Sequence, residues 1–347
     1  MTGTGTASRV LITGGAGFVG SHLARALHNR GDHVTVLDDF STGRAANLDD
    51  LLAEPDFDLV TGSVRDQALL DELTDRSDTV FHLAAAVGVQ MVVEDALTTI
   101  ETNVMGTACV LEAAARTGAK VMLASTSEVY GKCVKLPACE DDDVLIGASR
   151  NSRWSYAASK MVDEFLALAY HRQRGLPVVV FRLFNTVGPR QSGRYGMVVP
   201  RFVRAALSGD LLHVHGDGLQ SRSFLHVDDA VAGIIALWRC PEAVGEVFNL
   251  GGTEEVTILE VAARVLDQAD RRVSADAIVH IPYQEAYARG FEDIRRRVAD
   301  TSKLRRYTGW APTRSLDQIL ADVADALRDE LSAQGTGNGP MAVSAPA

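Results

Sequence analysis

The sequence has few cysteines and no long apolar run. Its four cysteines, Cys109, Cys133, Cys139 and Cys240, form neither a C-x-x-C pair nor a disulfide-dense pattern, and reduced thiols fit a cytoplasmic compartment. No stretch approaches the length of a membrane-spanning helix, so we expect no membrane partner. Residues 1–8 are small and polar and lack the apolar segment of a secretory signal, which also favours a cytoplasmic protein.

Basic residues are also fewer than acidic ones. The chain has 34 Lys and Arg against 45 Asp and Glu, a net charge of −11, which argues against binding a nucleic-acid backbone as the main activity. A small anionic substrate held by local arginines stays possible. The chain contains no internal repeat, and with 46% apolar and 23% charged residues its composition is that of a globular protein. At 347 residues it is long enough for about two units.

Short apolar runs rich in β-branched residues alternate with helix-length segments through the first half of the chain. The runs are Arg9–Thr13, His33–Leu37, Thr79–Leu83, Lys120–Ala124 and Pro177–Leu183. The segments between them include Phe18–Arg30, Ala96–Thr117 and Tyr156–Arg174. This alternation predicts an α/β fold with a Rossmann-type, doubly wound parallel sheet.

After Leu183 the pattern loosens, which predicts a smaller C-terminal α/β unit that binds the substrate. Its expected helices are 200–207, 228–238, 258–268 and 316–331. We place the first unit at residues 8–185 and the second at 186–331, with 228–250 returning to the first sheet because Glu246–Leu250 reads as a strand. Residues 332–347 lack apolar periodicity and are predicted to be a disordered tail.

A glycine-rich turn follows the first predicted strand. Residues 13–20, TGGAGFVG, contain a G-x-x-G-x-x-G spacing that opens a helix. Glycines there let the backbone approach a pyrophosphate, and the helix N-terminus favours its charge. The position between strand and helix therefore predicts a dinucleotide site.

Asp38 selects between the two nicotinamide dinucleotides. It lies eighteen residues past Gly20 at the end of the second strand, where a carboxylate can accept both hydroxyls of an adenosine ribose. A 2′-phosphate would be repelled by Asp38 and Asp39, so the sequence favours NAD over NADP.

A phenol and an ammonium stand one helical turn apart in Tyr156-Ala-Ala-Ser-Lys160. They follow a strand that ends in Ser125-Thr-Ser-Glu-Val-Tyr-Gly131, and further motifs are HLAA at 82–85, NVMGT at 103–107, RLFNTVGPR at 182–190 and GDGLQSRSF at 216–224. Together with the nucleotide turn, these resemble the extended short-chain dehydrogenase/reductase family, in particular its nucleotide-sugar epimerases, dehydratases and decarboxylases. The resemblance spans roughly residues 9–331.

The resemblance implies a bound NAD, a UDP-sugar substrate and a homodimer built through a four-helix bundle. The implied cofactor residues are Gly14, Ala16, Gly17, Phe18, Val19, Gly20, Asp38, Asp39, Phe40, Ser41, Thr42, Gly43, Ser63, Val64, Leu83, Ala84, Ala85, Asn103, Tyr156 and Lys160. The implied substrate residues are Asn185, Arg190, Val199, Gln220, Arg222, Arg289 and Arg297. Ser63 stands where the family usually has an aspartate that accepts from adenine.

The family's chemistry assigns roles to the residues at the strand end. Tyr156 would take the proton of a sugar 4-hydroxyl as C4 is oxidised, with Lys160 favouring the phenolate and Thr126 sharing a hydrogen bond with the reacting oxygen. Because a tyrosine has a pKa near 10, we expect positive charge from Lys160 and from oxidised NAD to lower it.

The Thr126-Ser127-Glu128 run bears on which reaction follows. Ser127 replaces the acid of the Asp-Glu pair typical of 4,6-dehydratases, whereas UDP-glucuronate decarboxylases resemble the run closely. We therefore expect decarboxylation of UDP-glucuronate through a 4-keto intermediate to UDP-xylose, the UDP-4-keto-pentose, or both, with Glu128 assisting proton movement. A UDP-hexose or UDP-hexuronate 4-epimerase stays open as the alternative enzyme, and a non-catalytic NAD sensor as the alternative class.

The arginine cluster at 295–297 and a histidine pair complete the candidate residues. Alignment with the decarboxylase Arg-Lys-Pro-Asp pattern favours Arg297, and the other arginines of the cluster can equally belong to a solvated face. His213 and His215 would share one strand face without a third ligand, so we predict no metal site.

Overall fold

The structure is a computed structural model of the chain. It describes residues 7–88, 95–133, 135–193, 197–269, 277–286 and 293–336.

A seven-stranded sheet forms the first unit, in the strand order β11-β6-β5-β4-β1-β2-β3, and every neighbouring pair is parallel. The strands are β1 (Arg9–Thr13), β2 (His33–Asp38), β3 (Phe57–Thr61), β4 (Thr79–His82), β5 (Lys120–Thr126), β6 (Val178–Leu183) and β11 (Val247–Leu250). The predicted Rossmann-type sheet is confirmed, since the order reverses direction at β1.

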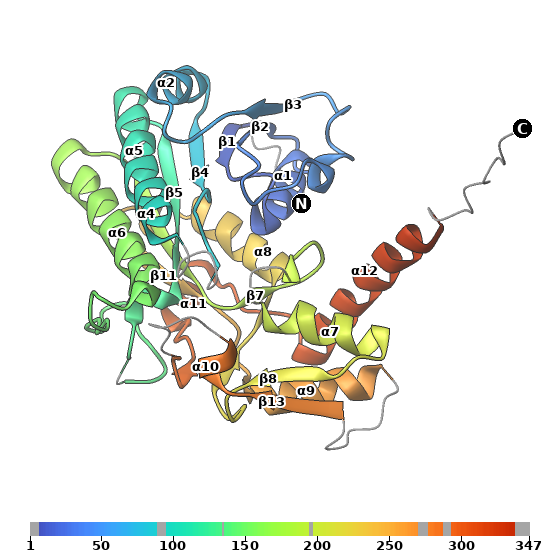
Figure 1. Cartoon of the computed structure of the whole chain (residues 1–347). Coiled ribbons are helices and arrows are strands. Elements are labelled where there is room, and N and C mark those ends of the chain that lie inside the picture. The colour runs from blue at the N-terminus through green and yellow to red at the C-terminus, as the bar shows by residue number, and fades with distance from the viewer. Residues whose placement is uncertain are drawn as a thin grey trace, which may run out of the picture.

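Helices cover both faces of this sheet (Figure 1). They are α1 (Phe18–His28), α2 (Gln67–Asp75), α4 (Ala96–Ile100), α5 (Gly106–Thr117), α6 (Ser155–Arg174) and α8 (Val227–Trp238). A π-helical turn at Glu101–Met105 joins α4 to α5, so the segment predicted as one helix is continuous but locally widened. The helices α4, α5 and α6 lie together on one face, and α1 and α8 lie on the other (Figure 1).

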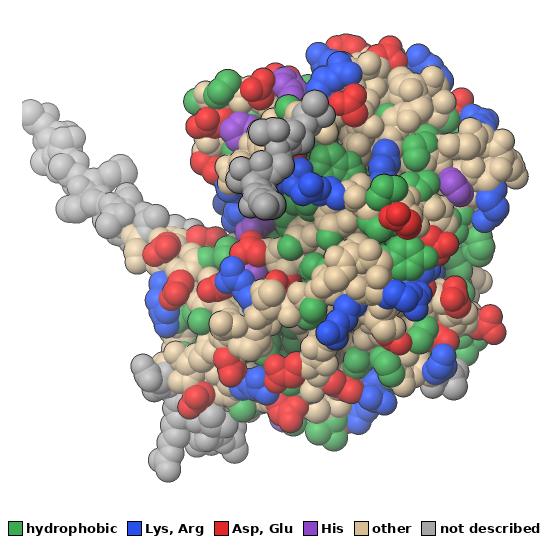
Figure 2. Space-filling model, turned by 180° about the vertical axis from the view of Figure 1, so that it is seen from behind, with side chains coloured by type: hydrophobic (Ala, Val, Ile, Leu, Met, Phe, Trp, Pro, Cys, Tyr) green, Lys and Arg blue, Asp and Glu red, His purple; other side chains and the backbone are tan. Residues whose placement is uncertain are grey.

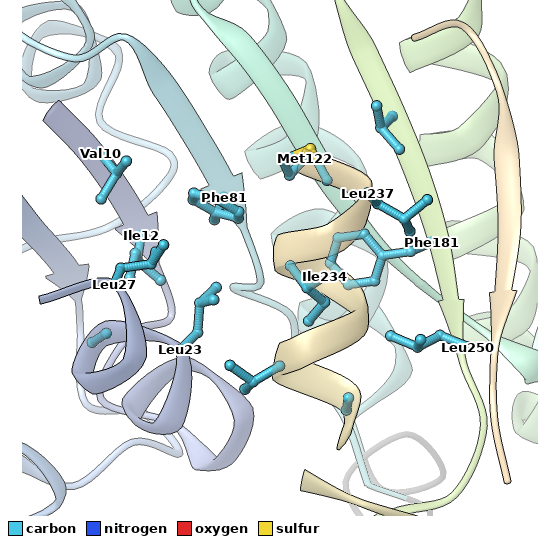
Figure 3. Packing of buried hydrophobic residues seen from close by; sticks show 14 of the residues in the cluster. Val10, Ile12, Leu23, Leu27, Phe81, Met122, Phe181, Ile234, Leu237 and Leu250 are labelled. Carbon is cyan, nitrogen blue, oxygen red and sulfur yellow. The ribbon is translucent and has the colours of Figure 1, made fainter. Parts of the chain in front are cut away.

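The main core lies between the sheet and the α1–α8 pair. Ile234 and Leu237 of α8 point toward Phe81 and Phe181 of the strands, and all four side chains are fully buried (Figure 3). Because the strands are covered on both faces, their sequences read as nearly continuous apolar runs.

The second unit gathers smaller sheets around α7 and α9. Its elements are β7 (Thr186–Val187), α7 (Val198–Ser208), β8 (Leu212–His215), β9 (Ser221–Ser223), β10 (Leu225–His226), β12 (Glu255–Thr257), α9 (Ile258–Gln268), β13 (Ile278–Ile281), α10 (Tyr283–Ala286), β14 (Arg296–Arg297), α11 (Ser302–Thr308) and α12 (Leu316–Thr336). A separate apolar cluster from α7, α9 and α12 forms its core.

The two units interleave more than the sequence predicts. Strand β11 lies beside β6, so the chain returns to the first sheet. Leu304 of α11 and Trp310 also pack into the core of the first unit, although both fall inside the range given to the second. Their apolar side chains cover the edge formed by β11 and α8, which would otherwise be exposed.

Two further features differ from the sequence analysis. Strand β3 was not predicted, because Asp58 interrupts its apolar run and most of its residues are partly exposed at the sheet edge. Helix α12 continues to Thr336, so the predicted disordered tail from residue 332 begins too early. Residues 337–347 lie outside the described part of the chain.

Surface charge is mixed rather than segregated on the face turned away in Figure 1. Figure 2 shows basic and acidic side chains interspersed there. Among the described residues, no helix has both the length and the apolar character needed to cross a bilayer.

Candidate active site

One cavity of about 510 Å³ runs along the carboxyl ends of the strands and continues between the two units. Its walls contain the glycine turn, the end of β2, the end of β5, the start of α6, and residues of β6–β9 and α7. Ligands of open α/β sheets bind at this edge.

The nucleotide end of the cavity is shaped by glycines that admit no larger residue. Gly14 has φ +72°, and a Cβ there would lie 2.7 Å from the Ala84 nitrogen. A Cβ on Gly20 would lie 2.2 Å from the Gly14 carbonyl oxygen. The turn therefore packs against α1 and the end of β4 as closely as a pyrophosphate cradle requires.

Two backbone N–H groups fix the Asp38 carboxylate. Its Oδ2 atom accepts from the Ala16 N–H and its Oδ1 atom from the Phe40 N–H, each at 2.9 Å. Burial raises the pKa of Asp38, and these two backbone donors oppose the rise. Both carboxylate oxygens are thus held in place, with a lone pair on each left for further donors.

Most of the predicted cofactor residues meet on the cavity wall. These are Gly14, Gly17, Phe18, Val19, Gly20, Asp38, Asp39, Ser41, Thr42, Val64, Leu83, Ala84, Ala85, Tyr156 and Lys160. The others support the wall: Ala16 and Phe40 bind Asp38, Gly43 packs against it, Ser63 accepts from Arg65 N–H, and Asn103 accepts from Ala86 N–H.

A buried ion pair fixes the helix that carries Tyr156 and Lys160. Arg182 of β6 donates to Glu164 of α6 through Nε at 2.9 Å and Nη2 at 2.7 Å. Ser125 of β5 also binds Glu164. Because these contacts tie α6 to β5 and β6, the first turn of α6 stands over the end of β5.

Tyr156 lies against the strand end as expected. Its hydroxyl hydrogen-bonds with Thr126, whose Oγ1 also accepts from the Glu128 N–H at 3.2 Å. Burial, followed by the negative charge of Glu128, raises the pKa of Tyr156, while the Thr126 hydrogen bond lowers it. The pKa of Tyr156 is thus raised, whereas the sequence analysis expected the charges of Lys160 and oxidised NAD together to lower it.

Glu128 is held by two arginines. Arg153 forms a two-pronged ion pair with it, one prong measuring 2.9 Å, and Arg297 Nη2 lies 3.1 Å from its Oε1 atom. Burial acts to raise the pKa of Glu128, but Arg153 and Arg297 outweigh it and lower the pKa to about 2. A carboxylate with this pKa is a weak base, so the structure favours an ion-pairing role over the predicted assistance to proton movement.

A further arginine lies at this end of the cavity. Arg222 donates to Asp293 at 3.0 Å, and burial, with Arg297 next, lowers the pKa of Arg222 to about 10. Arg153, Arg222 and Arg297 thus converge near Glu128 and Asp293. Three guanidinium groups against two carboxylates leave one positive charge for an anion.

The remaining predicted substrate residues also line the cavity, with two qualifications. Asn185, Val199 and Gln220 lie on its walls, and Ser127 lies beside Glu128. Arg190 donates to the Asn47 carbonyl at 3.2 Å and so sits beside the loop after β2. Arg289 lies outside the described residues.

Sequence reasoning missed Arg153 and Asp163, and it considered His213 and His215 only as possible metal ligands. Arg153 stands three residues before Tyr156, a spacing that could have drawn attention to it. Both histidines line the cavity, and burial, followed by Arg201, lowers the pKa of His215 to about 4. Among the residues that the structure describes, no cluster of three or more His, Cys, Asp or Glu is placed to hold a metal.

Known proteins are similar to this chain in sequence and in fold. Residues 11–323 match the family described as GDP-mannose 4,6 dehydratase. The chain belongs to this family, a branch of the extended short-chain dehydrogenases/reductases. The resemblance seen in the motifs is therefore confirmed at the level of the family.

Relatives within the family include decarboxylases and epimerases. The chain is 44% identical to a UDP-N-acetyl-alpha-D-glucosaminuronate decarboxylase of Bacillus cytotoxicus, covering 92% of this chain and 98% of the relative. It is 38% identical to UDP-glucuronic acid decarboxylase 1 of Arabidopsis thaliana, covering 95% and 72%. Among solved structures, a Bacillus cereus UDP-glucuronic acid 4-epimerase in complex with UDP-glucuronic acid and NAD superposes with a TM-score of 0.83 at 28% identity, covering 93% and 99%.

Proposed function

We propose that this protein is an NAD-dependent decarboxylase of UDP-glucuronate. The observation that carries the proposal is the set of arginines, Arg153, Arg222 and Arg297, around Glu128 at the substrate side of Tyr156. Guanidinium groups bind both carboxylates and diphosphates, and UDP-glucuronate carries both anions. The decarboxylase relatives that align over most of the chain support the same reading.

The nucleotide end fits NAD. The glycine turn provides the close backbone approach, and the fixed carboxylate of Asp38 provides an acceptor for a ribose diol and repels a 2′-phosphate. When bound there, NAD supplies reversible two-electron oxidation at the sugar C4.

The residues of this chain would then act on one oxygen. Tyr156 takes the proton of the 4-hydroxyl, and Thr126 shares a hydrogen bond with the same oxygen. Loss of this proton, together with the oxidation at C4, makes C4 a ketone. The C6 carboxylate is then β to that ketone, so breaking the C5–C6 bond releases CO₂ and leaves an enolate. Tyr156 and Thr126 donate to the enolate oxygen, a preorganised arrangement that stabilises the charge as it forms.

Two candidate substrates differ in the substituent at C2 of the sugar. The Bacillus cytotoxicus relative is named for an N-acetylated uronate, so UDP-N-acetylglucosaminuronate is the second candidate substrate for the same reaction. The similarity to a 4-epimerase supports 4-epimerisation as the alternative reaction.

Incubation with each UDP-uronate, followed by mass analysis of the sugar nucleotide, tests the proposal. Loss of one CO₂ from UDP-glucuronate supports it, and the residual mass distinguishes UDP-xylose from the UDP-4-keto-pentose. Loss only from the N-acetylated uronate reassigns the substrate. A product of unchanged mass that separates from the substrate by chromatography would show a 4-epimerase, and Tyr156→Phe serves as the inactive control.

We further propose that two copies pair through α4–α5 and α6. Large apolar side chains are exposed there, among them Leu97 at 68%, Met105 at 55% and Phe165 at 65%. A second copy of the same face would bury them as a four-helix bundle.

We also propose a cytoplasmic location for the protein. It is supported by the four cysteines, all of which are free. Cell fractionation tests it.

A further inference from the structure

Lys160 has a charged partner on its own helix. Its ammonium donates to Asp163 Oδ2 at 2.8 Å, one turn further along α6. The two side chains are 3% and 0% exposed, so the pair is shielded from solvent. A buried carboxylate in direct contact with Lys160 offsets much of the positive charge that Lys160 would otherwise present to Tyr156.

Asp163 stands at the end of a buried row of polar groups. The hydroxyl oxygen of Thr13, at the end of β1, lies 2.7 Å from Nδ1 of His82 on β4. On the other side of the ring, Nε2 of His82 lies 3.1 Å from the hydroxyl oxygen of Thr107 on α5. The Thr107 hydroxyl in turn lies beside the Asp163 carboxyl. Burial raises the pKa of Asp163, and Lys160, followed by the hydrogen bond from Thr107, lowers it. Within the described residues, the buried Oδ1 atom of Asp163 has no other hydrogen-bond partner, so it can accept from the Thr107 hydroxyl beside it.

The direction of every hydrogen bond in this row follows from its two ends. A carboxylate only accepts, so the Thr107 O–H is directed to Asp163 and the Thr107 oxygen accepts from His82 Nε2–H. Burial, followed by Lys160, lowers the pKa of His82 to about 3, so its ring is neutral and its Nδ1 accepts from the Thr13 O–H. The Thr13 oxygen accepts from the Ala84 N–H at 3.4 Å. All donors therefore point toward Asp163.

We propose that Asp163 is a positioning residue that holds the Lys160 ammonium, is itself oriented by Thr107 and His82, and keeps Tyr156 protonated until further positive charge enters the cavity. The proposal rests on the proposed function for the role of Tyr156, and its geometry does not depend on the identity of the sugar. In the reaction, the added charge is that of oxidised NAD, so the base would be activated only in a loaded enzyme.

Other charged groups face the same atoms and remain in every variant. Tyr156 also faces Glu128 and Arg153, which act on its pKa in opposite directions, and Asp163 also faces Glu164. His82 faces Lys160 from β4. A change made only at Asp163 therefore reports the contribution of its own charge.

The test is a titration of the Tyr156 phenol in NAD-loaded protein that requires no substrate. Phenolate absorbance is followed with rising pH, and Tyr156→Phe in the same background is subtracted. Because Asp163→Asn removes a negative charge near the phenol, we expect its ionisation to move to lower pH by about one pH unit. The acid limb of the kcat profile should move in the same direction.

Threonine variants keep the proposal testable if Asp163→Asn does not fold. Thr107→Val should shift the phenol titration in the same direction by a smaller amount, and Thr107→Ser should restore the wild-type value. The matched control is Thr74→Val in α2, which removes an equally buried hydroxyl that bonds only to backbone. In wild-type protein, nitrogen chemical shifts should show His82 as the neutral Nε2–H form.

A phenol titration that stays unchanged or moves to higher pH in Asp163→Asn overturns the proposal, as does a shift of equal size in Thr74→Val. An Nδ1–H form of His82 would also overturn it. Absence of decarboxylation together with the expected titration shift would instead reject only the proposed function, so the two failures are distinguishable.

Discussion

Arg296 and Arg297 are neighbours on β14 and make ion pairs in different places. Arg297 Nη2 lies 3.1 Å from Glu128 Oε1 inside the cavity, whereas Arg296 Nε binds Glu255 at 2.7 Å on the exposed side. Arg295 likewise pairs with Asp217 at the surface. Of the three arginines in the cluster, the structure thus turns Arg297 toward the site.

This difference provides a matched pair of variants. Arg297→Ala should lower kcat/KM for UDP-glucuronate by about 10²–10³, because a buried guanidinium that meets the substrate anion is lost. Arg296→Ala should leave kcat/KM within about twofold, since an exposed pair is worth little. Steady-state kinetics of both variants check this, and equal losses would contradict the orientation described here.

The Glu128 ion pairs should contribute strongly to stability. Glu128→Ala leaves the Arg153 and Arg297 guanidinium groups buried without their partner, so we expect the free energy of unfolding to fall by about 3–5 kcal/mol. The comparison is Asp142→Asn, which removes the partner of exposed Lys135 and should lower the free energy of unfolding far less. Urea unfolding measures both, and similar small losses would show that the buried cluster is not stabilising.

The same cluster predicts a pH dependence. The pKa of Glu128 is lowered in the folded protein to about 2, below its value of about 4.3 in an unfolded chain. Its contribution is therefore fully present above that unfolded value and is lost as the pH falls toward 2. Unfolding free energy measured across this range should fall less steeply in Glu128→Gln than in the wild type, and parallel curves would argue against the assignment.

Asp38 should decide cofactor affinity. Asp38→Ala removes the ribose acceptor and also frees the Ala16 and Phe40 N–H groups, so we expect NAD to bind about ten- to a hundredfold more weakly. Calorimetry checks this against Asp58→Ala on the exposed edge strand β3, which should bind NAD normally. Unchanged affinity in Asp38→Ala would place the ribose elsewhere.

The exposed apolar face predicts the oligomeric state. Phe165→Glu on α6 should convert a dimer to a monomer, because a charge would be buried in the interface. Leu52→Glu is the control, since Leu52 is also an exposed apolar residue but lies outside that face. Light scattering reports the molar mass, and a wild-type protein that is already monomeric would refute the proposed bundle.

The sequence was sufficient for the parts of the fold whose signal is local. Buried parallel strands read as apolar runs, and the glycine turn and the Tyr156–Lys160 spacing lie within single elements, so both could be placed before the structure was known. Strand β3 was missed because an edge strand with Asp58 as its second residue carries no such run.

The parts that could not be predicted depend on contacts between distant segments. Arg153 and Arg297 meet at Glu128 although 144 positions separate them, and no local pattern marks that meeting. The placement of Trp310 in the first core and the row from Thr13 to Asp163 likewise require knowledge of which elements pack together.

The fate of the sugar carboxyl carbon tests the central claim most directly. UDP-glucuronate labelled with ¹³C at C6 is incubated with the NAD-loaded protein and followed by ¹³C NMR. The account predicts that the label leaves the sugar and appears as carbon dioxide and bicarbonate, at a rate that Tyr156→Phe abolishes. Label that stays in a hexuronate, whether unchanged or inverted at C4, would contradict it.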